Sequence, residues 1–221
     1  MDKKVIFIDW HGTLSCSMFW EDLQLSHPDV FEQIQRILFK ADNTIIVDWM
    51  RGELSVNDVL DYLVDNGIKD RSLIEISLQE SCKNITFIDP HNLKLIQELR
   101  SQGYLCVLAT DNMDVFSKYT VPAYRLDTYF DDIINSSHVG ALKKERDEKE
   151  EFLFFSKFLK KHNLNISQAV LIDDSVKDQN HFEQMGLSFL PVNAVYSLRT
   201  HLEDICLNRR KGFLYKKARI Q

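Results

Sequence analysis

The sequence is poor in the residues that build disulfide frameworks, nucleotide loops and membrane spans. Its 221 residues include four cysteines, seven glycines and four prolines. None of the cysteines stands in a C-x-x-C pair, so the pattern is typical of reduced thiols rather than of a disulfide framework. No G-x-x-x-x-G-K-[ST] or G-x-G-x-x-G motif indicates a nucleotide site. The apolar runs fall well short of the roughly 20 residues that span a bilayer.

Charge and composition indicate a globular protein that acts on a small ligand. Hydrophobic residues make up 44% of the chain, charged residues 27%, and the net charge is −6. This balance argues against a general nucleic-acid binder, and we interpret the basic tail 208–221 as a solvated end. The apolar run at the start is too short for a signal peptide. We therefore expect a cytoplasmic protein with no membrane and no nucleic-acid partner.

Short apolar runs alternate with helical patterns over most of the chain. The runs are typical of buried strands and cover residues 5–8, 105–109, 133–134, 169–172 and 187–190. Helical spacing of apolar residues covers 92–102, 150–161 and 176–185. Strands that alternate with helices of this length predict an α/β fold with a mostly parallel sheet.

The segment between the first two strands breaks this alternation. Its apolar stripes predict helices over 28–40, 55–66 and 72–82, with Pro28 in a first turn and a capping box from Ser55 to Asp58. We therefore predict a helical subdomain at 15–85, inserted into a core formed by 1–14 and 86–221. Trp49 and Arg51 lie in this insert, and we consider them as substrate contacts, although buried aromatic residues usually pack a core.

Polar side chains directly follow three of the predicted strands. Asp9 follows the first, Thr110 the second, and Asp173 with Asp174 the fourth. In an open parallel sheet, ligands bind beyond the carboxyl ends of the strands. Clustered carboxylates repel one another unless a cation is present, and Mg²⁺ prefers such oxygen ligands. The sequence thus predicts a Mg²⁺ site at this edge of the sheet.

These residues stand in motifs that resemble those of the haloacid dehalogenase superfamily. Asp9-Trp10-His11-Gly12-Thr13, after an apolar strand, is similar to the family's first motif, Asp-x-Asp-x-Thr. Thr110, Lys143 and the pair Asp173-Asp174 resemble the other three motifs, in the same order. The resemblance covers about residues 4–195. It implies a Rossmann-like parallel sheet core with a helical, C1-type cap inserted after the first strand.

The resemblance also implies a Mg²⁺-dependent phosphatase that hydrolyses a small phosphate monoester through an aspartyl-phosphate intermediate. The implied catalytic residues are Asp9, His11, Thr110 and Lys143. The implied Mg²⁺ ligands are Asp9, His11 through its backbone carbonyl, Asp173 and Asp174. The implied substrate-binding residues are Thr110, Asp111, Asn112 and Lys143. Lys143 is chosen over Lys144 because it fits a Gly-x-x-Lys register from Gly140.

His11 departs from the family pattern, because phosphatases of the family usually carry an aspartate there as general acid and base. Three accounts compete. His11 performs the proton transfers itself, since its reference pKa is suited to neutral pH. Alternatively, the protein is a weakly active or non-catalytic phospho-ligand binder. In the third account it is a dehalogenase or phosphonatase, although family dehalogenases need no metal. The sequence leaves the substrate's identity and the oligomeric state open.

Overall fold

A parallel five-stranded sheet forms the centre of the protein. The computed structural model describes residues 4–39, 44–195 and 197–207. The strands lie in the order β3-β2-β1-β4-β5, and each neighbouring pair is parallel. Their bounds are β1 Val5–Ile8, β2 Leu105–Thr110, β3 Asp132–Asn135, β4 Ala169–Asp173 and β5 Ser188–Pro191. The predicted α/β class and all five predicted strands are confirmed.

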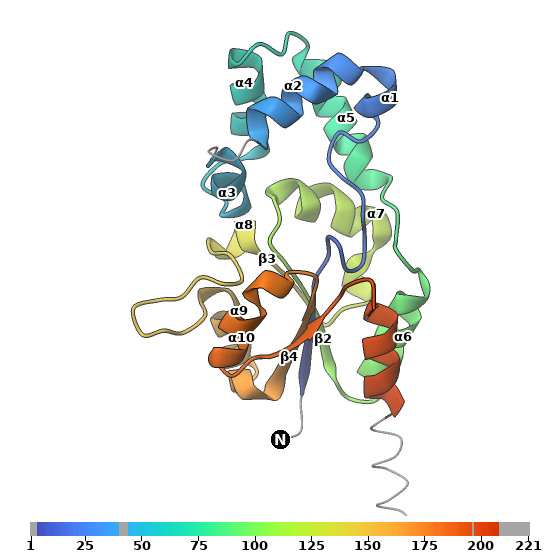
Figure 1. The fold of residues 1–221 in the computed structure, drawn as a ribbon, viewed down its shortest axis with the longest axis vertical. Coiled ribbons are helices and arrows are strands. Elements are labelled where there is room, and N and C mark those ends of the chain that lie inside the picture. The colour runs from blue at the N-terminus through green and yellow to red at the C-terminus, as the bar shows by residue number, and fades with distance from the viewer. Residues whose placement is uncertain (1–3, 40–43, 196, 208–221) are drawn as a thin grey trace, which may run out of the picture.

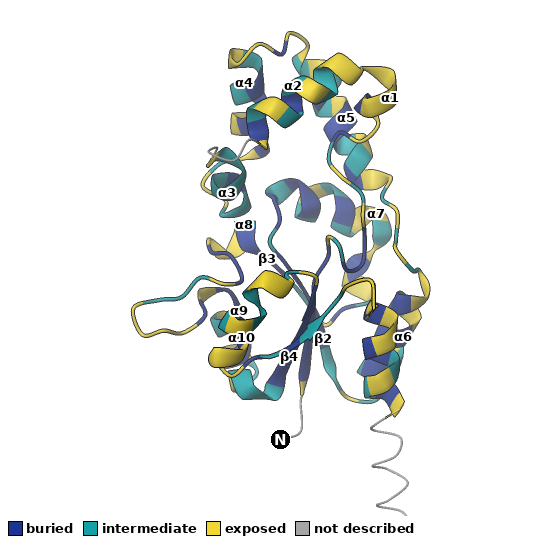
Figure 2. Cartoon of the chain, viewed as in Figure 1, coloured by how far each residue is buried: buried dark blue, intermediate teal, exposed yellow. Residues whose placement is uncertain are grey.

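Helices cover both faces of the sheet, which explains why its central strands are continuous apolar runs. Ile6 and Ile8 of β1 pack in a cluster with residues of α6 (His91–Ser101). Phe7 points to the opposite face and packs with residues of α9 (Leu153–Lys161) and α10 (Gln179–Gln184). Figures 1 and 2 show these layers and the buried strands between them. The remaining short elements are a π-helical turn Phe116–Thr120, α7 Val121–Tyr124, α8 Ser136–Val139, and 3-10 turns Leu126–Thr128, Ile166–Gln168 and Val176–Asp178.

A second group of helices lies beyond the carboxyl ends of the strands (Figure 1). It consists of α1 Leu23–Ser26, α2 Pro28–Leu38, α3 Ile45–Met50, α4 Val56–Asp65 and α5 Arg71–Lys83. These helices follow β1 and precede α6 and β2, and they pack around an apolar cluster with Trp20 and Trp49 that Met113 and Val115, which follow β2, complete from the core. The division at residues 15 and 85 stays a prediction, and we refer to α1–α5 below as the helical insert.

Local sequence explains where the helices of the insert begin. Pro28 occupies the first position of α2, as predicted. The Ser55 side chain accepts the backbone N–H of Asp58, and the Asp58 carboxylate accepts the N–H of Ser55, so the predicted capping box at α4 is present. The short helix α3 was not predicted, because its six residues are too few to show a helical period.

Three predicted helices differ from the structure at their bounds. The pattern over 176–185 begins with the 3-10 turn Val176–Asp178, so the α-helix α10 covers only Gln179–Gln184. The pattern over 150–161 becomes a helix only from Leu153, because Glu150 has a left-handed φ of 62° and the Asp147 carboxylate accepts the N–H of Glu151 in a turn. The pattern over 28–40 ends at Leu38, and Lys40 lies outside the described residues. The basic tail 208–221 also lies outside them. Among the helices that are described, none is both long and apolar enough to cross a membrane.

Candidate functional site

Three carboxylates meet at the carboxyl edge of the sheet. One carboxylate oxygen from each of Asp9, Asp173 and Asp174 lies within 4.8 Å of the others. The sheet causes this meeting, because β1 and β4 are parallel neighbours in which Ile8 pairs with Ile172, so both chains leave the sheet at the same level. Asp9 and Asp173 are buried, whereas Asp174 is exposed. The predicted convergence of these side chains is therefore present.

Lys143 places a buried ammonium group between two of the carboxylates. Its Nζ donates to Asp9 Oδ1 at 2.7 Å and to Asp173 Oδ2 at 2.5 Å. The loop that carries Lys143 is fixed from the neighbouring strand, because the backbone N–H of Lys143 donates to Asp111 Oδ1 at 2.8 Å. Lys144, the alternative weighed from the sequence, is exposed. The structure thus brings Lys143 and not Lys144 to the carboxylates.

Burial and charge shift the pKa values in this cluster in different directions. Burial raises the pKa of Asp9 to about 8, although Lys143 acts to lower it. Burial and the neighbouring Asp173 also raise the pKa of Asp174. Burial acts to raise the pKa of Asp173 too, but the charge and hydrogen bond of Lys143 hold it below its usual range. One ammonium group therefore does not balance three carboxylates.

This excess of negative charge fits a divalent cation. Mg²⁺ takes hard oxygen ligands and commonly binds one or two carboxylates together with waters and a phosphate. Asp9, Asp173 and Asp174 offer such oxygens within a few ångströms of one another, and the exposed side of Asp174 leaves room for further ligands. A cation at this place would favour the ionised form of Asp9.

Gly12 allows the loop after β1 to pass close to Asp174. Its φ is +75°, and a Cβ built on it would lie 2.0 Å from Asp174 Oδ2. Any side chain at this position must therefore displace the Asp174 carboxylate. The left-handed backbone adds strain for a residue that carries a Cβ.

We expect Gly12→Ala to weaken Mg²⁺ binding at least about tenfold, equivalent to about 1.4 kcal/mol, because the new methyl group displaces Asp174. Isothermal titration calorimetry with Mg²⁺ measures this effect. Gly186→Ala is the matched control, since Gly186 has a similar φ of +84° and its added Cβ meets only Ile166 Cγ2 at 3.7 Å. Equal Mg²⁺ affinity in the two variants would contradict the role of the Gly12 contact.

The end of β2 provides hydroxyl and amide groups on the other side of Asp9. Thr110 is buried, and Asn112 Nδ2 lies 3.5 Å from its Oγ1. The backbone N–H of Asn112 donates to Ser136 Oγ at 2.9 Å, which fixes the loop after β2 to the start of α8. Sequence reasoning missed Ser136. The same strand-end rule would have found it, because Asn135 and Ser136 directly follow the apolar pair of β3.

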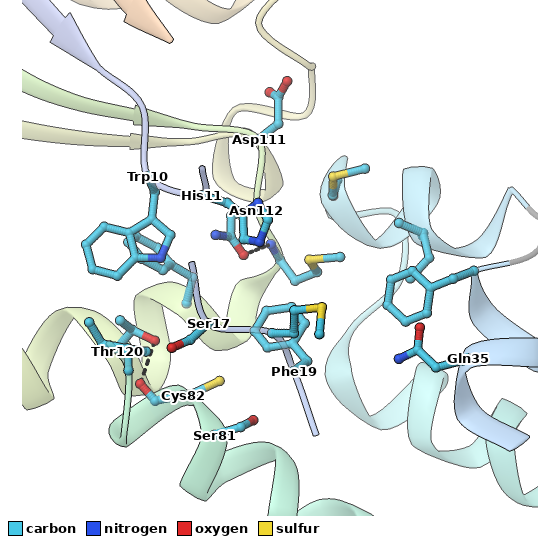
Figure 3. A pocket seen from close by; sticks show the side chains of 17 residues that line it. Trp10, His11, Ser17, Phe19, Gln35, Ser81, Cys82, Asp111, Asn112 and Thr120 are labelled. Atoms are coloured by element: carbon cyan, nitrogen blue, oxygen red, sulfur yellow. Dashed lines mark hydrogen bonds between the residues drawn. The ribbon is translucent and has the colours of Figure 1, made fainter. Parts of the chain in front are cut away.

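A cavity of about 360 Å³ lies between the helical insert and the strand ends (Figure 3). Trp10 and His11, which follow Asp9, line it together with Asp111 and Asn112, which follow Thr110. The other lining residues are Ser17, Met18, Phe19, Gln35, Phe39, Ile46, Met50, Ser81, Cys82, Ile85, Met113, Phe116 and Thr120. Its volume is in the range of small-molecule sites. One of its lining residues, Trp10, directly follows Asp9 of the carboxylate cluster in the sequence. His11 is exposed within this region.

Trp49 and Arg51 fasten the helical insert to the core. The Trp49 indole N–H donates to Asp114 Oδ1 at 2.7 Å, and the Arg51 Nε donates to Glu145 Oε1 at 3.0 Å. Trp49 is fully buried, as expected of a core aromatic residue. Neither side chain is among the residues that line the cavity. The sequence alone did not predict that Asp114 and Glu145 are the partners of Trp49 and Arg51, because both partners lie far away along the chain.

Comparisons with known proteins bear on the family and on the fold of the chain. A family model described as haloacid dehalogenase-like hydrolase matches residues 53–192, which is more than half of the chain. No curated protein sequence matches the chain.

Solved structures show the same fold. An enzyme of this family from Bacteroides thetaiotaomicron, an aspartate-to-alanine mutant in complex with magnesium and inorganic phosphate, has 16% identity and a TM-score of 0.70 over 88% of this chain and 96% of that one. A predicted HAD-like hydrolase from Porphyromonas gingivalis has 18% identity and a TM-score of 0.66 over 88% and 93%. The L-2-haloacid dehalogenase from Xanthobacter autotrophicus has 15% identity and a TM-score of 0.62 over 86% and 77%.

Proposed function

The chain belongs to the haloacid dehalogenase-like hydrolase family, and on that premise we propose that it is a Mg²⁺-dependent phosphatase for a small phosphate monoester. The observation that carries the proposal is the cluster of Asp9, Asp173 and Asp174 around the Lys143 ammonium group. Such a cluster can hold an anionic nucleophile and a phosphate dianion at the same place. The structural similarity to an enzyme that binds magnesium and inorganic phosphate supports this assignment.

Asp9 acts as the nucleophile in this proposal. One of its carboxylate oxygens attacks phosphorus, the ester P–O bond breaks, and the alcohol leaves with a proton from His11. Water then attacks the aspartyl-phosphate, His11 takes its proton, and the Asp9–phosphorus bond breaks to release phosphate. A covalent route divides one difficult displacement into two easier ones.

The residues around Asp9 neutralise and orient the phosphoryl group. Lys143, which already contacts Asp9, neutralises charge on the phosphoryl oxygens, and Thr110 donates its hydroxyl to one of them. The proposed Mg²⁺ ligands are Asp9, the backbone carbonyl of His11, Asp173 and Asp174. Bound Mg²⁺ would supply the positive charge that the approaching phosphate needs. Asp111 and Asn112 complete the proposed substrate contacts, and the predicted subdomain 15–85, which contains the helical insert, forms the cap over them.

Hydrolysis of p-nitrophenyl phosphate, measured with Mg²⁺ and with EDTA, tests the proposed function. We expect turnover with Mg²⁺ and a fall of at least about 10²-fold with EDTA, because removing the cation leaves the carboxylates unbalanced against the phosphate. Restoring excess Mg²⁺ should restore the rate. Equal rates with Mg²⁺ and with EDTA would reject Mg²⁺-dependent phosphoryl transfer.

His11 is expected to carry the proton transfers. His11→Ala should lower kcat about 10²-fold or more, whereas His11→Asp should keep or raise it, because both His and Asp can exchange a proton with the leaving oxygen. The kcat of each variant on p-nitrophenyl phosphate checks this. If His11→Ala matched the parent enzyme, the acid-base role would be wrong.

The other accounts of His11 make different predictions for the same protein. A phospho-ligand binder would bind inorganic phosphate in the presence of Mg²⁺ but would not turn over p-nitrophenyl phosphate. A dehalogenase would release halide from a 2-haloacid without Mg²⁺, a possibility raised by the structural similarity to a dehalogenase. The three-carboxylate cluster favours the phosphatase, because an anionic cluster without a cation would repel a haloacid carboxylate.

A further inference from the structure

We propose that the alcohol released by this enzyme is an apolar, ring-sized group without a second anion, so that the substrate is an aryl, benzyl or cycloalkyl phosphate rather than a sugar phosphate or a phosphorylated carboxylic acid. This inference rests on the proposed phosphatase activity. It follows from the chemistry of the cavity between the helical insert and the core. We place the leaving group there because His11, which protonates the leaving oxygen in the proposed mechanism, lines this cavity.

The wall of the cavity is mostly apolar on both sides. Phe19 lines it from the turn before α1, Ile46 and Met50 line it from α3 of the helical insert, and Met113 and Phe116 line it from the core. Trp10 lies at the end next to Asp9, where it packs edge-on against Phe116 with ring centroids 5.1 Å apart. Thioether and aromatic side chains of this kind favour hydrocarbon rings over hydroxylated ones.

Most polar groups in the wall are already occupied by internal hydrogen bonds. Ser17 Oγ accepts the backbone N–H of Thr86 at 2.7 Å. Ser81 Oγ donates to the carbonyl of Leu78 at 2.9 Å and also accepts a backbone N–H. These hydroxyl groups hold the wall together. A sugar would therefore lose hydrogen bonds to water that this wall does not replace.

The same holds on the core side of the cavity. Thr120 Oγ1 donates to the carbonyl of Cys82 at 2.9 Å, which Figure 3 shows as a dashed line. Asn112 Oδ1 accepts the backbone N–H of Met113 at 2.9 Å. Among the described lining residues, His11 and Gln35 are the polar side chains outside internal hydrogen bonds of this kind. Because His11 serves the leaving oxygen in the proposed mechanism, Gln35 is the one that remains for a single hydroxyl or carbonyl of the leaving group.

The part of the wall that the structure describes offers a second anion little positive charge besides His11, whose proton goes to the leaving oxygen in the proposed mechanism. Within the described ranges of the chain, no lysine or arginine lines the cavity. Lys143 contacts Asp9 and Asp173, so its charge lies where the phosphoryl group is proposed to bind and not in the cavity wall. The Asp111 carboxylate points away from the other labelled side chains in Figure 3 and accepts the N–H of Lys143. A carboxylate on the leaving group would thus find no lysine or arginine partner in the described wall, which is unfavourable where it is buried.

Two matched pairs of primary phosphate esters test this inference on the wild-type protein with Mg²⁺. Cyclohexylmethyl phosphate and glucose 6-phosphate have the same ring size and the same type of ester bond. We expect kcat/KM to be about 10²-fold higher for the cyclohexyl ester, because the hydroxylated ring finds few partners. The kcat/KM for benzyl phosphate should be at least tenfold higher than that for 4-carboxybenzyl phosphate. The pairs share their leaving-group chemistry, so a difference reports on the cavity.

A variant that adds a positive charge tests whether the preference arises in this cavity. Met50→Lys places a cation in its wall and should raise the 4-carboxybenzyl to benzyl ratio of kcat/KM at least fivefold. Ile76→Lys is the matched control, because Ile76 is 62% exposed on α5 and does not line the cavity. That control should leave the ratio unchanged.

The outcomes separate this inference from the proposed function. If glucose 6-phosphate or 4-carboxybenzyl phosphate is turned over as fast as its apolar partner, the leaving-group class is wrong while the phosphatase stands. If no ester, including p-nitrophenyl phosphate, is hydrolysed with Mg²⁺, the phosphatase itself is wrong and the inference is rejected with it.

Discussion

Replacing Asp9 by asparagine is expected to lower kcat on p-nitrophenyl phosphate by at least about 10³-fold, since losing a nucleophile removes the covalent route. The substitution keeps the size and shape of the side chain, so the packing beside Lys143 is preserved. The amide cannot attack phosphorus and is a poorer Mg²⁺ ligand than a carboxylate. The loss should therefore appear in kcat even at saturating Mg²⁺.

Asp65→Asn is the control for this variant, because Asp65 is an exposed aspartate at the end of α4. We expect it to keep the parental kcat. Substantial Mg²⁺-dependent activity in Asp9→Asn would remove Asp9 from the role of nucleophile, whatever the other residues of the cluster do.

Lys143→Met is expected to lower kcat about 10²-fold or more, because it removes a positive charge aimed at the transferring phosphoryl group. The variant also leaves Asp9 and Asp173 without the ammonium that both contact. Michaelis parameters at saturating Mg²⁺ measure the effect. Lys144→Met is the matched control, since Lys144 is the adjacent residue but is exposed, and it should change kcat less than about twofold.

The same variant should lose stability in a pH-dependent way. Removing one partner of a buried ion pair costs about 3–5 kcal/mol. Lys143 holds the pKa of Asp173 below its usual range, so it contributes stability above that range that is lost as pH falls through the lowered pKa. The deficit of Lys143→Met should therefore persist from neutral pH down to about pH 4, the usual range of an aspartate, and shrink only below it. Urea unfolding of the Mg²⁺-free proteins checks this, and a deficit that grew as pH fell would contradict it.

The strands and the carboxylates could be predicted from the sequence because both depend on local patterns. The run Val5–Ile8 is apolar on both faces, which indicates a central parallel strand, and Asp9 follows it directly. The same reasoning located Asp173 after the strand that pairs with β1. Topology then brings the strand ends together, so the cluster needed little information beyond strand order.

Long-range contacts could not be predicted in the same way. The hydrogen bond from Trp49 to Asp114 spans 65 positions of the sequence, and the ion pair from Arg51 to Glu145 spans 94. No periodicity in a single sequence marks such pairs. The internal hydrogen bonds that occupy Ser17 and Ser81 also depend on tertiary packing, so the apolar character of the cavity became visible only in three dimensions.

The most direct test of the account is to look for the phosphoryl group on Asp9. The enzyme is mixed with Mg²⁺ and benzyl phosphate, quenched in acid within the first turnovers, digested and analysed by mass spectrometry. The account predicts a hydroxylamine-sensitive phosphoryl group on the peptide that contains Asp9, absent with EDTA and absent in Asp9→Asn. Rapid Mg²⁺-dependent hydrolysis with the phosphoryl group on another residue would contradict it.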